Sequence, residues 1–261
     1  MLNWLKTLIA QLALMGSKSP KVIPETLWRH TLKRYSFLAQ LSAADQLQLR
    51  QLVGHFLRNK EFSGANGLIV TDKMAVAIAA QACLPVLHLG LSWYDDFTGI
   101  VVHAGAMLAR RESTDHAGVV HHYQEELLGE AMRGGPVTLS WQDAAATGNT
   151  AERGHNVVIH EFIHKIDMRD GNADGCPPLP SRAAYAAWRR AMKPAYKRFC
   201  EQVTMAERFG AAPPWLDAYG ASEPAEFFAV TCEAFFMNRE RFSQDFPELS
   251  TLFTQFFKLR S

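Results

Sequence analysis

The sequence lacks a charge excess and a cysteine framework, and each absence excludes a class of protein. Its 27 basic and 26 acidic residues give a formal net charge of +1. There is therefore no basic excess of the kind that marks direct nucleic-acid binding. Four cysteines occur in 261 residues, and none forms a CxxC pair typical of a metal or redox site. We expect free thiols, a reducing compartment and a cytoplasmic protein.

A long apolar segment is also missing. No run of apolar residues approaches the ~20 that a membrane-spanning helix needs. The first 16 residues, MLNWLKTLIAQLALMG, superficially resemble a signal peptide. However, Gln11 interrupts the apolar stretch and no small-residue cleavage site follows it. We expect an amphipathic helix or a mobile end here, and no association with a membrane.

The composition is that of a globular domain, with 48% hydrophobic and 20% charged residues. Neither an internal repeat nor a linker divides the chain, and the only Pro/Ser-rich joint is 17–26. The length is sufficient to bury a core without disulfides. We therefore predict a single domain over 1–261, in which a helical N-terminal region, 1–60, packs on the core.

Hydrophobic periodicity predicts the elements of this domain. We expect helices over 27–39, 44–59, 72–83, 181–208, 223–238 and in the tail from 241. We expect strands over 67–71, 84–90, 99–105 and 136–141. Strands crowd the first half and helices the second, which indicates an α+β fold rather than alternating βαβ units. Pro136 suits an edge strand, and its strand, PVTLSW, is expected to line a cleft and to pair with an extended peptide.

The most informative stretch is HEFIH, which begins at His160. Asn156 is a suitable helix N-cap, and apolar residues follow it at helical spacing. On a helix, His160 and His164 project from one face a turn apart, so both imidazoles can hold one tetrahedral zinc ion. Glu161 leans over the same site, where a general base must lie to take a proton from activated water. Asp167 either accepts the outer N–H of a ligand histidine or caps the helix end.

A catalytic zinc site needs a third protein ligand, and the sequence offers three glutamates on a later helix. Glu223 suits the first turn, where it complements the helix dipole behind Ser222 as N-cap. Glu226 and Glu233 are seven residues apart and share a face. One of them could bind zinc while the other orients a ligand histidine, and the spacing favours Glu226.

HEFIHKIDMRDG followed by DAYGASEPAEFFAVTCEAFF resembles the Mlc titration factor A family of bacterial zinc metallopeptidases. CLPVLHLGLSWYDDF and GPVTLSW also look like segments of that family, so the resemblance covers most of the chain. The family's core is similar to that of anthrax lethal factor. The resemblance implies a zincin-like metallopeptidase fold with a small mixed sheet, one zinc ion per chain and aminopeptidase-like hydrolysis of peptides. It also implies binding to the glucose repressor Mlc.

The resemblance also implies roles for individual residues. His160, His164 and Glu226 match the zinc ligands, and Glu161 matches the general base. Tyr219 matches the tyrosine that supports the tetrahedral intermediate. A phenol can do so by donating a hydrogen bond to the oxygen on which negative charge develops.

Family members can place a further histidine on the metal, from a segment before the GPVTLSW strand. The GVVH stretch gives this role to His121, and the adjacent His122 leaves the assignment open by one position. A fourth protein ligand would displace the catalytic water and hold the enzyme at rest.

Two other functions share these residues. The chain could be a regulatory module that sequesters a repressor and keeps only a structural or vestigial zinc ion. It could also be a zinc hydrolase that acts on a non-peptide amide.

Overall fold

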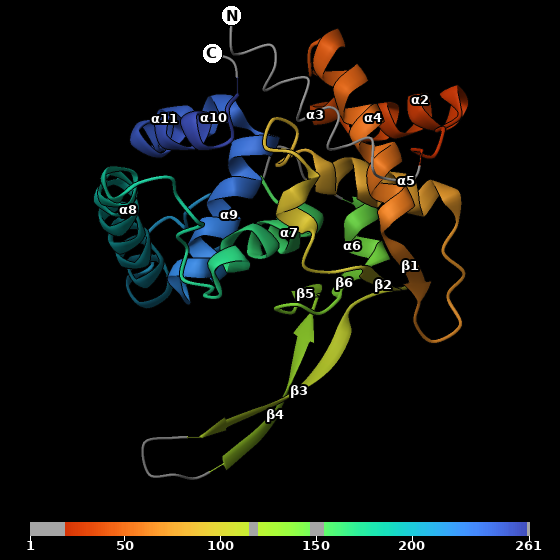
Figure 1. Cartoon of the computed structure of the whole chain (residues 1–261). Helices are drawn as coiled ribbons and strands as arrows, with labels where there is room; N and C mark the ends of the chain where they lie inside the picture. Colours follow the sequence, from red (N-terminus) through yellow and green to blue (C-terminus); the bar gives the residue numbers. More distant parts are fainter. Residues whose placement is uncertain (1–18, 115–119, 147–153, 260–261) are drawn as a thin grey trace, which may run out of the picture.

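The structure is a computed structural model that describes residues 19–114, 120–146 and 154–259, of which only the backbone is described over 108–114 and 120–127. It is a mixed α+β fold in which the helices lie on one side of a small sheet (Figure 1). The expected N-terminal helix falls outside the described residues. Among those that are described, none of the helices combines the length and apolar character required to span a bilayer.

The central sheet has the order β1-β2-β6-β5. The bounds of these strands are Glu61–Gly64, Gly99–His103, Val137–Ser140 and Gly129–Ala131. β1, β2 and β6 are parallel, whereas β5 runs antiparallel to β6. Ile100 and Val102 lie opposite Val137 and Leu139, and all four side chains are buried. Because alternate residues of a strand share a face, this apolar face is the one that packs against the helices.

The order of the strands corrects the expectation that PVTLSW forms an edge strand. β6 is an interior strand, because it pairs with β2 on one side and with β5 on the other. Pro136 precedes the strand, so its missing N–H removes no bond from the ladder. The two edge strands are β1 and β5, and the sequence patterning predicted neither.

Two other expected strands are wrong. Over 67–71 the chain is not in a strand: it turns tightly, with the Leu68 N–H donating to the Ala65 carbonyl, and Thr71 then caps the next helix. Over 84–90 the chain forms successive turns, although Val86 and Leu87 are buried. In both segments the apolar residues pack against the core from irregular backbone. A short apolar run alone does not distinguish that arrangement from a strand.

The expected helices are present with small differences at their ends. The first splits into α2 (Glu25–Arg34) and α3 (Ser36–Ala39) at Tyr35, which is buried and donates to the Ala144 carbonyl. The remaining α-helices are α4 (Ala43–Asn59), α5 (Asp72–Cys83), α6 (Trp141–Ala146), α7 (Val157–Asp167), α8 (Arg182–Phe209), α9 (Pro224–Met237), α10 (Arg239–Asp245) and α11 (Pro247–Phe256).

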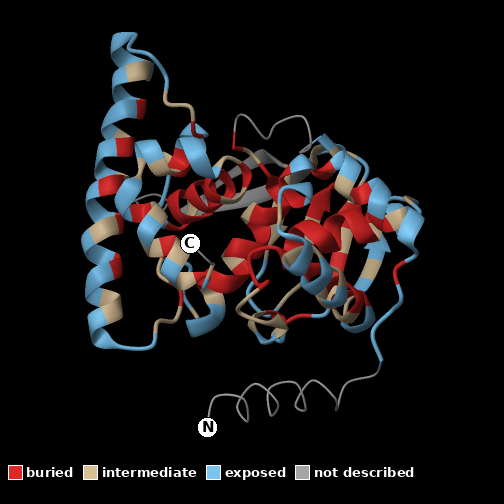
Figure 2. Ribbon diagram, turned by 90° about the horizontal axis from the view of Figure 1, so that it is seen from above, coloured by how far each residue is buried: buried red, intermediate tan, exposed pale blue. Residues whose placement is uncertain are grey.

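Most residues of α7 and α9 are buried, and the buried parts of the chain gather in the interior of the molecule (Figure 2). α7 contacts α9, α5 and the strands β5 and β6. Its Phe162 ring lies 5.1 Å from that of Tyr94 and 5.7 Å from that of Phe56. On α9, the Phe228 ring lies 5.3 Å from that of Trp188 on α8, and such aromatic pairs add to the burial energy. The two helices are thus held by large aromatic contacts on the sides away from their polar residues.

A two-stranded hairpin, which the sequence patterning missed, extends away from the sheet (Figure 1). β3 (Met107–Thr114) pairs antiparallel with β4 (Val120–Leu127). Both strands are rich in charged residues and lack the alternation that marks one buried face, so the pattern carried no strand signal.

Candidate metal centre

The HEFIH segment lies on α7, as its spacing predicts. The Asn156 side chain accepts a hydrogen bond from the Ile159 N–H at 3.0 Å, which confirms the expected N-cap. The apolar residues of α7 are buried, whereas His160 and His164 are only partly buried and line a cavity of about 470 Å³. The amphipathic pattern therefore turns both imidazoles toward the cavity.

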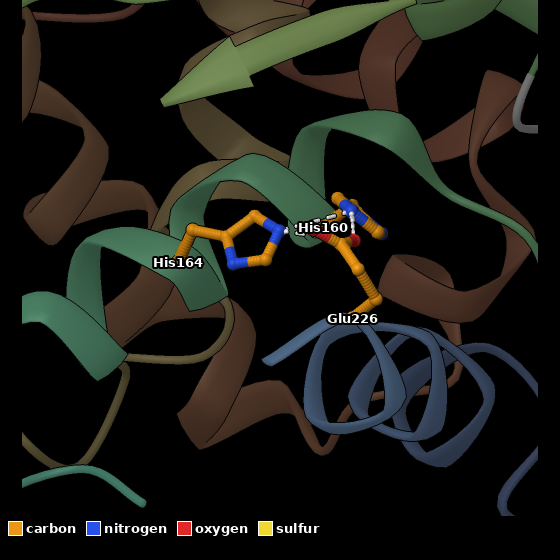
Figure 3. A group of neighbouring side chains, drawn as sticks. All are labelled: His160, His164 and Glu226. Atoms are coloured by element: carbon orange, nitrogen blue, oxygen red, sulfur yellow. Dashed lines mark hydrogen bonds and ion pairs between the residues drawn. The ribbon is translucent and has the colours of Figure 1, made fainter. Parts of the chain in front are cut away.

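His160, His164 and Glu226 point toward one another from α7 and α9 (Figure 3). The two Nε2 atoms are 3.1 Å apart, and Glu226 Oε2 lies 2.9 Å from His160 Nε2 and 3.3 Å from His164 Nε2. Ligand atoms that are 2.0–2.1 Å from a tetrahedral zinc ion lie about 3.3 Å from one another. The three groups therefore fit the ion, with two neutral imidazoles and one carboxylate as donors.

The two glutamates of α9 contact different nitrogen atoms of His160. Glu233 Oε1 lies 2.7 Å from His160 Nδ1, on the ring side opposite Glu226. Glu233 is buried and its Oε2 accepts the Asn156 N–H. Burial would raise the pKa of Glu233, but its contacts with His160 and His155 lower it. An ionised Glu233 fixes the tautomer that leaves His160 Nε2 free to bind a metal ion.

Glu161, on α7, packs its side chain against the edge strand β5. Its side chain is only 5% exposed, and burial raises its pKa. A Cβ atom on Gly129 of β5 would lie 2.5 Å from Glu161 Oε1. Gly129 therefore leaves the space that the carboxylate occupies. A carboxylate with a raised pKa beside the ligands is suited to proton transfer near neutral pH.

This close approach predicts the effect of Gly129→Ala. The new methyl group must displace the Glu161 carboxylate, because that flexible side chain yields more readily than the paired strand. We expect kcat/KM to fall by about 10²-fold, the cost of a misplacement near 1 Å, with little change in melting temperature. Gly99→Ala on β2 is the matched control, because its Cβ would make an ordinary contact with Pro136 at 3.4 Å. Equal activity of the Gly129 variant and wild type would contradict the packing argument.

Tyr219 also faces the cavity. It lies in the short 3-10 helix η6 (Ala218–Ala221), is 49% exposed, and its ring is 6.3 Å from the ring of His160. The Asp217 carboxylate accepts the Tyr219 N–H at 2.9 Å. The sequence suggested Ser222 as the N-cap of α9, but Glu223 occupies that position. The Ser222 hydroxyl instead donates to the Tyr219 carbonyl at 2.7 Å. Ser222 and Asp217 thus both brace the turn that carries the phenol.

Asp167 takes neither of its two expected roles. Its Oδ2 accepts the Gly175 N–H at 2.8 Å, and no described hydrogen bond joins it to His160 or His164. Burial raises its pKa to about 7. The residue anchors the loop beyond α7.

The proposed fourth ligand lies on the hairpin. The backbone of His121 is in β4 opposite Ser113, and that of His122 is opposite Glu112. The side chains of this hairpin lie outside the described residues. The assignment of His121 to the metal therefore stays a prediction.

The edge of the sheet that borders the cavity is β5 rather than β6. Leu128, Gly129, Glu130 and Ala131 line the cavity, whereas β6 is paired on both sides. The expected strand for an extended peptide is therefore β5, because only an edge strand presents unpaired backbone groups.

Sequence reasoning missed His155, which lines the same cavity. Its Nδ1 lies 3.2 Å from Glu233 Oε2 and 3.9 Å from Asp217 Oδ2. The contact with the Glu233 carboxylate raises the pKa of His155 against the opposing effect of burial. The residue precedes the N-cap of α7 and belongs to no spacing pattern, so the sequence contained no signal for it.

Comparison with known proteins agrees with this geometry. Residues 14–258 match the sequence profile of a family described as glucose-regulated metallo-peptidase M90. The chain is 35% identical over 222 residues to Mlc titration factor A of Klebsiella pneumoniae (strain 342), covering 85% of this chain and 82% of the relative. It is 37% identical over 222 residues to Mlc titration factor A of Edwardsiella ictaluri (strain 93-146), covering 85% and 83%. It is 35% identical over 237 residues to the protein of that name from Serratia proteamaculans (strain 568), covering 90% and 88%.

Proposed function

The chain belongs to the M90 family of glucose-regulated metallo-peptidases, and from this premise we propose that it is a zinc-dependent peptidase of the aminopeptidase type. The observation that carries the proposal is the convergence of His160, His164 and Glu226 beside the buried Glu161. One zinc ion per chain would be held by these two imidazoles and one carboxylate. The zincin-like form of the site, with a single domain over 1–261, is part of the same proposal.

Each residue of the proposed site has its own role in the reaction. When bound, zinc would supply the Lewis acidity that polarises the scissile carbonyl and acidifies water. Glu161 takes the proton of the attacking water and passes it to the leaving amine. Tyr219 donates a hydrogen bond to the oxygen on which negative charge develops. Glu233 holds the ring of His160 in place.

The charge of the cavity supports the aminopeptidase type. Its described lining includes no lysine or arginine. The acidic residues that line it are Glu130, Glu161, Asp217, Glu223, Glu226 and Glu233. Three of these, Glu130, Asp217 and Glu223, are neither proposed ligands, nor the proposed general base, nor described contacts of His160. A cavity with this excess of carboxylates favours a substrate that brings a positive charge, such as a free α-ammonium group.

This proposal predicts that blocking the substrate amine lowers the rate. Chromogenic amino-acid amides and short peptides, each free or N-acetylated, would be compared with and without chelator. Loss of one charge-assisted hydrogen bond costs about 1.5–3 kcal/mol, so we expect acetylation to reduce kcat/KM roughly 10- to 100-fold. Equal rates on free and acetylated peptides would indicate an endopeptidase. Hydrolysis of non-peptide amides alone would indicate that the protein is a zinc hydrolase but not a peptidase.

A second function rests on the relatives, which are named Mlc titration factor A. We propose that this chain also binds the repressor Mlc, in the cytoplasm and without contacting nucleic acid itself. Binding and hydrolysis are compatible, since the cavity occupies one part of the molecule. The alternative is a repressor-sequestering protein in which the zinc ion is structural or vestigial.

A further inference from the structure

His155 lies between two carboxylates of the proposed site, those of Glu233 and Asp217. It directly precedes Asn156, the N-cap of α7, and its Nδ1 is 3.2 Å from Glu233 Oε2 and 3.9 Å from Asp217 Oδ2. Each carboxylate contacts a different residue of the proposed site. Glu233 contacts His160, and Asp217 caps the turn of Tyr219.

The backbone before His155 fixes this placement. Gly154 has φ +66°, and a Cβ atom there would lie 2.8 Å from the Trp215 ring and 3.1 Å from Ala234 of α9. Only glycine adopts this conformation readily in so close a contact. The chain is therefore pressed against α9 one residue before His155, which directs the imidazole toward Glu233 on the same helix.

His155 is not among the residues that could hold the metal ion. In the described part of the chain, the cluster of potential ligand atoms contains His160, His164 and Glu226 alone. The nearest described acidic contacts of the His155 ring are Glu233 and Asp217. His155 Nδ1 is thus in contact with Glu233 and 3.9 Å from Asp217, so the ring links the two carboxylates.

We propose that His155 is a positioning residue that ties the Tyr219 turn to His160 through Asp217 and Glu233. This inference rests on the proposed function, because the purpose of the link is to hold the phenol over the reaction site. Tyr219 is half-exposed on a turn of only four residues. Without the link, its ring gains freedom and reaches the developing oxyanion less often.

The test is His155→Ala in the zinc-loaded full-length protein. We expect kcat to fall about 10-fold, the lower end of the range for supporting residues around a metal site, with KM and zinc content nearly unchanged. His155→Asn keeps a donor near the position of Nδ1 and is expected to restore most of the activity. His88→Ala is the matched control, because His88 pairs with Asp45 at 3.5 Å in another part of the structure.

A double-mutant cycle with Tyr219→Phe distinguishes positioning from a general structural effect. If His155 acts through the phenol, His155→Ala should cost little further activity once Tyr219 is phenylalanine. Fully additive losses, or an unchanged kcat in the single variant, would overturn the inference.

A second readout does not depend on turnover. In protein with ¹³C-labelled tyrosine, the Tyr219 ring signal is identified by its loss in Tyr219→Phe. We expect this signal to shift in His155→Ala and to stay in place in His88→Ala. An unmoved signal would overturn the inference even if the protein proved not to be a peptidase, whereas a shifted signal in an inactive protein would count against the proposed function alone.

Discussion

Glu161→Gln is expected to lower kcat/KM by on the order of 10³-fold, within the range for loss of a general base, while zinc stays bound. Glu161 has no atom in the described ligand cluster, so the metal site should survive the change. Glutamine has nearly the same shape and fits the space beside Gly129, but it cannot accept the proton of water. Peptidase assays together with elemental analysis for zinc would measure both quantities.

Glu240→Gln is the control, because Glu240 is exposed on α10. A Glu161 variant that hydrolyses peptides as fast as wild type would refute the role of general base. The same variant separates the two proposed functions when its binding to purified Mlc is measured. Retained binding with lost turnover indicates two separable functions, whereas binding by a wild type that never hydrolyses peptides indicates the sequestering protein.

Removal of the metal, by chelation or by His164→Ala, is expected to abolish hydrolysis and to lower the melting temperature. A ligand present at 1,000 times its dissociation constant stabilises the native state by about 4 kcal/mol, and this contribution disappears with the ion. The fold itself should remain, because α7 and α9 are also held by aromatic contacts such as that of Phe162 with Tyr94. Activity, zinc content and thermal unfolding would be followed together.

His30→Ala controls for the loss of a histidine, because His30 is exposed on α2. Zinc added back to the chelated wild type should restore both activity and melting temperature, and it should restore neither in His164→Ala. If chelated protein kept full activity and bound no added zinc, the metallopeptidase proposal would be wrong.

The sequence alone predicted the parts of the site that depend on local geometry. The spacing of His160 and His164 and the cap at Asn156 are properties of one helix, whose hydrogen bonds join residues four apart. The same reasoning placed Glu226 and Glu233 on one face of α9. It reduced the third ligand to a few carboxylates and favoured Glu226, the residue that the family resemblance also implies.

Only the tertiary structure decided which groups meet across the cavity. Gly129 and Glu161 approach because β5 takes the edge of the sheet, and His155 meets Glu233 because Gly154 packs against α9. Such contacts join residues far apart in the chain and leave no periodic trace in it. Segment 84–90 failed as a strand for the same reason, since strand formation depends on a distant partner, whereas a helix supplies its own hydrogen bonds.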